Sequence, residues 1–300
     1  VIGTDMKALK RMAEKKLGVP CIAINAIGTR YYDEGEEEAW LQLFKEFAYK
    51  DNASEKGEDI VTREIVDKEY TGIIGATPLE TGYSTEKPLL KACTEYGIDS
   101  PIIFGMGNGL EDISKAPFCK KNIVVSVAGL KAAGYLEDKF GIPYEVAFPF
   151  IPEEIKESVR YEVKKLFNTA SERDDLENNT TKKILIIHTQ FAANELKAII
   201  REAVSNNNID SPEKPASGTV SVDTATFFMK SDNYSEEGDI HLSGEDDLWE
   251  IIHKKEYDLI IADGDIERLV QAAGYEGRFI NYPHFAISGN MNDDSVLFFS

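Results

Sequence analysis

The stretch that decides the fold runs from Ile102 to Ile113 and reads IIFGMGNGLEDI. An apolar run is followed by glycines at positions 105, 107 and 109, and then by residues typical of a helix start. A change from strand to helix across bare backbone fits three structures. It can be a phosphate loop for a dinucleotide, a tight turn with Asn108 at positive φ, or a ligand crevice at the carboxyl end of a parallel sheet.

The spacing of these glycines disfavours the dinucleotide site. The dinucleotide fingerprint is GxGxxG between a strand and a helix. Here the glycines follow GxGxG, and the third fingerprint position is Leu110. Glu111 and Asp112 in the first helical turn complement the helix dipole but would repel a pyrophosphate. The tight turn and the ligand crevice remain as alternatives.

Strand-like and helix-like segments alternate on both sides of this stretch. Strands and helices of these lengths, in alternation, predict parallel pairing with right-handed crossovers. We therefore predict an α/β fold of tandem Rossmann-like units, with open, mostly parallel sheets flanked by helices. The strands are expected within residues 70–77, 100–106, 121–127, 143–150, 183–189, 218–228 (one or two strands), 257–263 and 278–283. The helices are expected at residues 86–96, 110–116, 130–140, 152–166, 192–204, 245–253 and 266–273.

The first part of the chain predicts two further helices and a strand. Apolar residues at helical spacing predict helices at residues 4–17 and 34–49, and the sequence CIAIN predicts a strand at 21–25. Polar, unpatterned stretches predict a surface loop at 50–59, a linker within 168–183 and a second loop at 206–217. The two later groups of strands look like two copies of one architecture.

Composition excludes several classes of protein. The chain has 300 residues and a formal net charge of −20, which argues against binding nucleic acid through a broad basic surface. No apolar run approaches the roughly 20 residues that span a bilayer, so no membrane partner is expected. Three cysteines without a CxxC pair fit a reducing cytoplasm and make a self-contained metal cluster unexpected. The chain begins without Met in a strand-like segment, from which we expect that a preceding part of a larger protein is missing.

Several phrases, in order, resemble the component 1 family of nitrogenase-type oxidoreductases, which includes the light-independent protochlorophyllide reductases. The resemblance covers most of the chain but neither residues 51–67 nor 206–238. No single phrase is diagnostic, and their order and spacing carry the resemblance. The phrases are IGTDMKALKRMAEKKLGVPCIAINAIGTRYYDEG, TGIIGATPLETG, FGMGNGLEDISKAPFCKKNIVVSVAGLKAAGYLEDKFGIPY and RFINYPHFAISG.

The resemblance implies three Rossmann-like units around a central site. Residues 1–67 would be the C-terminal part of a first unit, 68–170 a second unit, 171–181 a linker and 182–300 a third unit. The iron–sulfur cluster through which electrons enter would have its ligands upstream of this chain. The implied partners are an ATP-dependent iron–sulfur reductase, like the nitrogenase iron protein, and a homologous component 1 subunit in a homo- or hetero-oligomer.

The resemblance also suggests where a substrate or cofactor would lie. Ser126 matches a position at which nitrogenase holds its metal cofactor with a cysteine, so a cofactor anchored by that thiolate is not expected here. The proposed crevice residues are Arg30, Thr77, Gly107, Asn108 and Ser126; the catalytic residues are unknown. His284 lies near a family metal ligand and is a candidate to bind metal, although a histidine packed at a sheet edge fits as well.

Two other residues have alternative interpretations. His188 ends a strand, where open α/β sheets place ligands, but a strand-end histidine often only satisfies a backbone group. Arg30 either steers an anionic substrate or pairs with Asp33. Cys21, Cys93 and Cys119 are expected to be structural.

Together these observations predict part of a nitrogenase-like oxidoreductase subunit. It would accept electrons from the reductase and reduce a bound substrate, which the resemblance suggests could be tetrapyrrole-like. We expect these 300 residues to be inactive alone. The alternative is a protein that binds a small molecule, or holds a metallocluster during cofactor assembly, without turnover.

Overall fold

The computed structural model describes residues 5–24, 30–48, 70–168, 181–209 and 219–292 and divides into two compact units. The first unit contains Val1–Ala76 and Gly97–Val146, and the second contains Thr77–Tyr96 and Ala147–Ser300. Each unit has one parallel sheet, so the α/β class predicted from the sequence is confirmed. The three-unit division with its boundaries at residues 67, 170 and 181 stays a prediction.

The first unit is built on a four-stranded parallel sheet in the order β2-β1-β3-β4. The strands are β1 (Tyr70–Ile74), β2 (Pro101–Ile103), β3 (Cys119–Val124) and β4 (Tyr144–Val146). Its helices are α1 (Met6–Leu17), α2 (Tyr32–Phe47), α5 (Leu110–Ile113), η2 (Ala116–Phe118), η3 (Val127–Gly129) and α6 (Leu130–Phe140). The predicted helix at 130–140 is confirmed residue for residue, because Gly141 ends it in the left-handed conformation.

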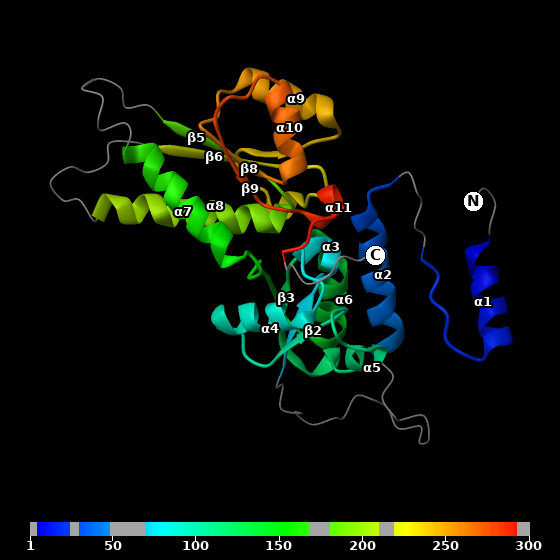
Figure 1. The fold of residues 1–300 in the computed structure, drawn as a ribbon. Helices are drawn as coiled ribbons and strands as arrows, with labels where there is room; N and C mark the ends of the chain where they lie inside the picture. The colour runs from blue at the N-terminus through cyan, green and yellow to red at the C-terminus, as the bar shows by residue number, and fades with distance from the viewer. Residues whose placement is uncertain (1–4, 25–29, 49–69, 169–180, 210–218, 293–300) are drawn as a thin grey trace. The chain divides into compact units, whose positions relative to one another are not determined.

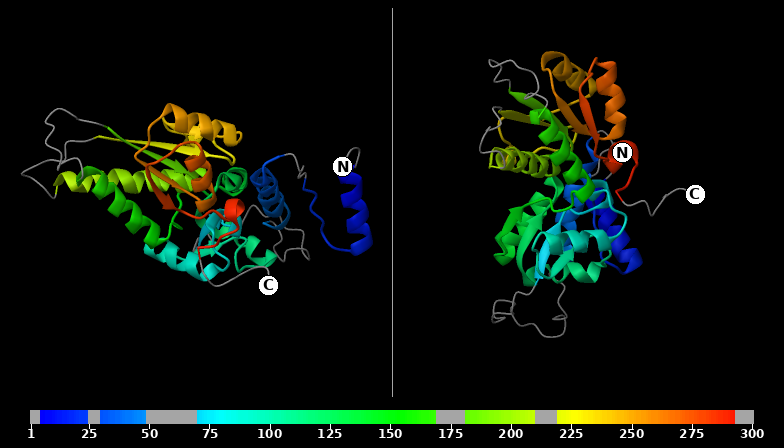
Figure 2. Two further views of the ribbon diagram at one scale, coloured as in Figure 1. Left: turned by 45° about the horizontal axis from the view of Figure 1, so that its top comes forward. Right: turned by 60° about the vertical axis from the view of Figure 1, so that its left-hand side comes forward.

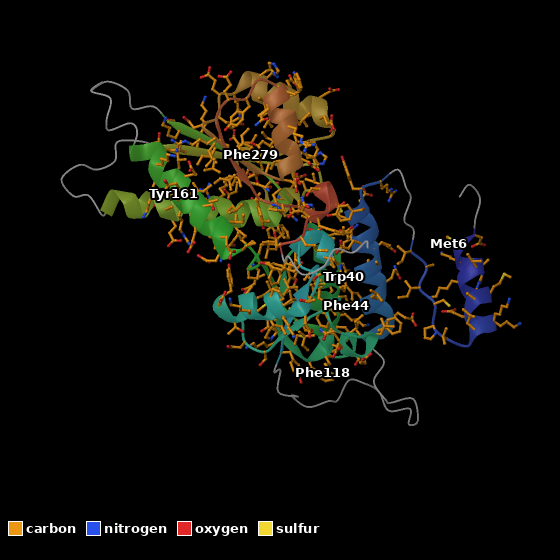
Figure 3. All side chains as sticks on the ribbon, in the orientation of Figure 1. Met6, Trp40, Phe44, Phe118, Tyr161 and Phe279 are labelled. Atoms are coloured by element: carbon orange, nitrogen blue, oxygen red, sulfur yellow. The ribbon has the colours of Figure 1, made fainter. Side chains whose placement is uncertain are left out.

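The core of the first unit contains a row of aromatic rings from α2. Trp40 and Phe44 lie one turn apart on this helix, and Figure 3 shows the two side chains. The Phe44 ring meets Phe104 edge to face with 5.1 Å between ring centroids. α2 also packs beside α6, as Figure 1 shows. Burial of these aromatic rings therefore joins the helix to the end of β2.

The second unit is built on a five-stranded parallel sheet in the order β7-β6-β5-β8-β9. The strands are β5 (Lys182–Ile187), β6 (Val220–Thr226), β7 (Asp239–His241), β8 (Leu259–Ala262) and β9 (Arg278–Asn281). The helices are α3 (Pro78–Thr81), α4 (Glu86–Glu95), α7 (Glu153–Asn168), α8 (Gln190–Ile209), η4 (Asp232–Tyr234), α9 (Glu245–Lys254), α10 (Gly264–Ala272) and α11 (Phe285–Ser288). No helix in the described ranges is both long and apolar enough to cross a bilayer.

Helices cover both faces of this sheet. Leu185 and Ile187 of β5 join a buried cluster with residues of α9 and α10, while Ile184 and Ile186 are buried on the opposite face. Figure 2 shows the sheet lying between α7 and α8 on one side and α9 and α10 on the other. Burial on both faces explains why the strand reads as a continuous apolar run rather than as an alternating one.

Some expected elements are wrong. Residues 21–24 form no ladder with another described segment, so the predicted strand at 21–25 is not observed there. The predicted polar loop at 206–217 is wrong at its start, because α8 continues to Ile209. The expectation of one or two strands within 218–228 is confirmed with one strand, β6, in the described residues 219–228. All of the predicted loop at 50–59 and most of the linker lie outside the described residues.

Candidate functional site

Each sheet has a point at which the strand order reverses, and the sequence places polar residues there. In the first unit the chain passes from β1 outward to β2 and then returns to β3 on the other side of β1. The loops after β1 and β3 therefore lead away in opposite directions, and open α/β sheets bind ligands in the crevice left between them. Gly75 follows β1 and Ser126 lies two residues after β3.

Ser126 is a buried hydroxyl without a hydrogen-bond partner. The residue is 2% exposed, and its Oγ accepts or donates no hydrogen bond within the described residues. It precedes η3 and α6 but makes no side-chain capping bond to them. Gly75 has φ of 88°, and a Cβ at this position would lie 2.3 Å from Ser126 Oγ. The absent side chain of Gly75 thus leaves room for this hydroxyl at the switch point of the four-stranded sheet.

Replacement of Ser126 by alanine should stabilise the first unit. An unpaired buried hydroxyl costs roughly 1–3 kcal/mol, and a methyl group at this position removes that cost. We expect Ser126→Ala to raise the free energy of unfolding by about 1 kcal/mol, measured by guanidinium denaturation. Ser288→Ala is the matched control, because its Oγ donates to Asp263 at 2.6 Å and its loss should destabilise the second unit. A destabilised Ser126→Ala variant would show that the hydroxyl is satisfied after all.

The glycine turn after β2 is held by packing and by its own side chains. Gly105 and Gly107 have φ of 87° and 72°, whereas Asn108 does not adopt positive φ, so that expectation is wrong. Asn108 Nδ2 instead donates to the Ile103 carbonyl at 2.8 Å. The helix that follows, α5, has only four residues, and the Gly109 N–H donates to Asp112 Oδ2. The Asp112 carboxylate therefore already accepts the hydrogen bond of the Gly109 N–H, which a bound phosphate would need.

Gly105 should tolerate no side chain. A Cβ at this position would lie 2.4 Å from Trp40 Cη2, and the positive φ adds backbone strain. We expect Gly105→Ala to lower the free energy of unfolding of the first unit by about 2 kcal/mol. The loss of free energy is measured by denaturation, followed through Trp40 fluorescence in a Trp249→Phe background.

Gly134 provides a matched control within the same unit. It lies inside α6, and a Cβ there would meet nothing within 4 Å. Gly134→Ala should therefore stabilise the unit by about 0.5–1 kcal/mol, because alanine loses less backbone entropy in a helix. Equal effects of the two substitutions would contradict the close packing of Trp40 on the turn.

Of the other predicted crevice residues, Arg30 precedes α2 and Thr77 belongs to the second unit. Arg30 is half-exposed and its guanidinium lies 3.5 Å from the Glu34 carboxylate, four residues further along the chain. Thr77 belongs to the second unit, where it precedes α3 and has a buried Oγ1 without a partner in the described part of the chain. The structure therefore groups Gly107 with Asn108 in one turn and Ser126 with Gly75.

The switch point of the five-stranded sheet lies between β5 and β8. His188 directly follows β5 and Asp263 directly follows β8. Asp263 is fully buried, and its Oδ2 accepts hydrogen bonds from the His284 N–H at 2.7 Å and from Ser288 Oγ at 2.6 Å. Its Oδ1 accepts from the Asp265 N–H at 2.9 Å. One carboxylate thus fixes both the start of α10 and the segment that carries His284.

His188 and His284 form a buried cluster with two aromatic rings. The imidazole rings meet edge to face with 4.9 Å between centroids. Tyr282 stacks on His188 at 4.2 Å, and Phe228 stacks on His284 at 4.6 Å. The residues His188 and His284 are 3% and 2% exposed, and Nε2 of each ring has no hydrogen-bond partner among the residues described.

Both imidazoles are neutral at neutral pH. Burial lowers the pKa of His284 to about 4, although the Asp263 carboxylate opposes this shift. Burial also lowers the pKa of His188 well below its usual range, and the neighbouring His284 adds to the effect while the Pro283 carbonyl opposes it. Neutral imidazoles can bind metals, so the ring nitrogens decide between metal binding and hydrogen bonding.

The described residues do not fit a protein-held metal cluster. His284 Nδ1 accepts a hydrogen bond from the Ala286 N–H at 3.2 Å, whereas a metal-bound histidine normally donates a proton from its second nitrogen. The described ranges contain no group of three or more His, Cys, Asp and Glu side chains that could hold a metal ion. Cys93 and Cys119 are buried cysteines that form no disulfide in the described residues, and burial raises the pKa of Cys93 to about 12, which keeps it protonated.

Sequence reasoning missed two residues that matter at these sites. Asp263 ends the segment YDLIIAD, and Tyr282 follows the last strand. The rule that identified His188, namely that open parallel sheets place ligand groups at strand ends, applies equally to Asp263. For Tyr282 the only signal in the sequence was its position after the last strand, because its stacking on His188, which is distant in the chain, follows no sequence pattern.

Comparisons with known proteins identify the family. The family model described as "Nitrogenase component 1 type Oxidoreductase" matches residues 1–204, which is more than half of the chain. Among curated proteins, none matches the chain.

Solved structures of nitrogenase Cp1 are similar in fold. The match to the structure at pH 6.5 has a TM-score of 0.55 and 13% sequence identity. It covers 94% of this chain and 65% of the nitrogenase Cp1 chain. The structure at pH 5 has a TM-score of 0.54 at 14% identity and covers 94% and 64%. The chain thus spans slightly less than two thirds of those proteins. The family match shows that this chain belongs to the nitrogenase component 1 type oxidoreductase family.

Proposed function

We propose that this chain acts in a component 1-type subunit that receives electrons from an ATP-dependent iron–sulfur reductase and reduces a bound organic substrate. The family membership supports the reaction class. The observation that carries the substrate site is Ser126, an unpaired buried hydroxyl at the switch point of the four-stranded sheet. Buried polar groups are normally satisfied, so a ligand is the natural partner of this one.

The proposed substrate is held by hydrogen bonds. Serine cannot replace the soft thiolate with which the resembling position of nitrogenase holds its cofactor, and a hydroxyl both donates to and accepts from an organic ligand. Gly107 and Asn108 would line this crevice in the first unit, and Arg30 and Thr77 remain proposed lining residues. A tetrapyrrole is the substrate class that the family resemblance suggests.

The electron-carrying cluster would be held by ligands other than Cys21, Cys93 and Cys119. An iron–sulfur cluster supplies one-electron transfer when bound. The residues described here would bind and orient the substrate, exclude water and position the hydroxyl proton of Ser126. The proposed partners are the reductase and a homologous component 1 subunit, in a homo- or hetero-oligomer.

Electron transfer from a reductase tests this function. The natural protein, meaning the protein that contains this chain as the cell makes it, is purified without oxygen. It is mixed with a dithionite-reduced reductase of the nitrogenase iron protein type. We expect the reductase to become oxidised when MgATP is added and not when MgADP is added, as followed by its visible absorbance. Absence of ATP-dependent oxidation, combined with retained binding of a small molecule, would favour a binding or cofactor-assembly protein.

Ser126→Ala separates the substrate site from electron entry. The variant should accept electrons from the reductase as the natural protein does, since the hydroxyl is assigned to the substrate. Its affinity for the substrate should fall about tenfold, the loss expected for one hydrogen bond. Unchanged affinity would remove Ser126 from the proposed site.

A further inference from the structure

The imidazole pair at the switch point of the five-stranded sheet has two unpaired nitrogens that the proposed function does not use. His188 Nε2 and His284 Nε2 are both buried and lack partners in the part of the chain that the structure describes. An unsatisfied buried polar group costs stability, and such groups cluster where a ligand completes them. Their place beside β5 and β8 is where a parallel sheet presents its ligand groups.

The tautomer of His284 follows from its capping bond. Nδ1 accepts a hydrogen bond from the Ala286 N–H at 3.2 Å, at the start of α11. A neutral imidazole carries one proton, so this proton is on Nε2. His284 therefore offers a buried N–H donor, whose natural partner is an acceptor atom and not a metal ion.

His188 extends the same site. Its Nδ1 lies 3.3 Å from Thr189 Oγ1, which leaves Nε2 for a ligand. The ring meets His284 edge to face, Tyr282 stacks on His188, and Phe228 stacks on His284. Flat apolar surfaces next to two polar nitrogens suit a ligand that is largely apolar and carries one polar atom.

The negative charge of Asp263, close to His284, favours a ligand whose acceptor atom is neutral. Asp263 is fully buried and its Oδ2 lies 2.7 Å from the His284 backbone nitrogen. A carboxylate ligand would be placed close to this carboxylate and would be repelled in a medium of low dielectric constant. A carbonyl oxygen accepts the same hydrogen bond without a second negative charge.

We propose that His284, together with His188, forms a hydrogen-bond donor site for the carbonyl oxygen of a largely apolar organic ligand at the carboxyl end of the five-stranded sheet. The donor site lies within the second unit, and its use in reduction rests on the proposed function, whereas ligand binding itself does not.

The tautomer is the first test and needs no ligand. The chain has four histidines, so nitrogen NMR of histidine-labelled protein at pH 7.5 resolves each ring. We expect the Nε2–H form for His284. His253 is the internal control, because its Nδ1 lies 2.8 Å from the Trp249 carbonyl oxygen and must donate when the ring is neutral. An Nδ1–H form of His284, or a shift of its Nε2 to that of a metal-bound nitrogen on adding Zn²⁺, would overturn the proposal.

Three related probes test the ligand class. Acetophenone, benzoate and ethylbenzene share one ring and differ in carrying a carbonyl, a carboxylate and neither group. We expect acetophenone to shift the His284 Nε2–H proton and to bind about tenfold more tightly than the other two, as one hydrogen bond predicts. Equal binding of ethylbenzene, tighter binding of benzoate, or no shift with acetophenone would each overturn it.

His284→Asn is the matched variant. Asparagine keeps an acceptor for the Ala286 N–H, because its Oδ1 takes the place of Nδ1, while its amide nitrogen takes the place of Cδ2 and leaves no donor at the position of Nε2. Acetophenone binding should fall about tenfold in this variant. It should persist in His253→Asn, and retained binding in His284→Asn would exclude the donor. These measurements do not involve the reductase, so failure of the electron-transfer proposal would leave their outcome unchanged.

Discussion

Asp263→Ala should lower the free energy of unfolding of the second unit by about 4 kcal/mol. The carboxylate accepts three hydrogen bonds, from the backbone of His284 and Asp265 and from Ser288 Oγ. Bonds to a charged group contribute roughly 1.5–3 kcal/mol each, and removal leaves buried donors without partners. Trp249 in α9 reports unfolding of this unit by fluorescence in a Trp40→Phe background.

Two further variants show whether the loss comes from these bonds. Asp263→Asn keeps one acceptor oxygen and should lose about half as much free energy. Asp265→Ala keeps its own backbone N–H donor to Asp263, so it should change stability by no more than about 0.5 kcal/mol. Equal midpoints for Asp263→Ala and Asp265→Ala would contradict the role given to the buried carboxylate.

Acid should destabilise the second unit through its two buried histidines. The pKa of His284 is lowered to about 4 by burial, and that of His188 is lowered in the same direction. The unfolded chain binds these protons at about pH 6.5, so stability is complete above that value and falls as the pH decreases toward 4. The pKa difference of His284 corresponds to about 3 kcal/mol, lost across this interval, and His188 adds to it.

The titratable groups that pack against the two imidazoles do not reverse this dependence of stability on pH. Asp263 opposes the shift of His284 and is already included in it, and burial raises the pKa of Tyr282 so that it stays neutral throughout. Denaturation midpoints of the natural chain and of His188→Phe/His284→Asn, compared from pH 7.5 to 4.5, measure the effect. The double variant should show a flatter dependence, because the remaining carboxylates are the same in both. Parallel curves would mean that the imidazoles already bind protons in the folded state.

Glycines that end helices and apolar runs that form buried strands made most of the fold predictable from sequence. Glycines end α1, α4 and α6 close to the predicted residues, and Gly18, Gly97 and Gly141 all adopt positive φ. The buried part of β5, residues 184–187, is apolar throughout, as parallel strands covered on both faces must be. Periodicity and helix ends therefore sufficed for the long elements.

Short elements depend on tertiary contacts that leave little trace in sequence. β7 has three residues and was not predicted, because it forms by pairing with β6 and through Asp239, which accepts from Thr224 Oγ1 and pairs with Lys197. The expected strand at 21–25 shows the converse, since an apolar segment forms a strand only where a partner is available.

The candidate site was predictable only in part, for a similar reason. Ser126 and His284 were identified from the family resemblance, and His188 from its position at a strand end. Their relation to Gly75, Asp263 and Phe228 depends on the strand order, which sequence does not contain. The role of His284 depends on one hydrogen bond to the Ala286 N–H, which no residue pattern predicts.

The central claim is that this member of the component 1 family takes part in redox chemistry without using its own three cysteines as cluster ligands. Iron and acid-labile sulfide content of the natural protein, purified without oxygen, tests it most directly when compared with Cys21→Ala/Cys93→Ala/Cys119→Ala. We predict that both preparations contain iron and sulfide in equal amounts. Absence of iron from the natural protein, or its loss in the triple variant, would contradict the claim.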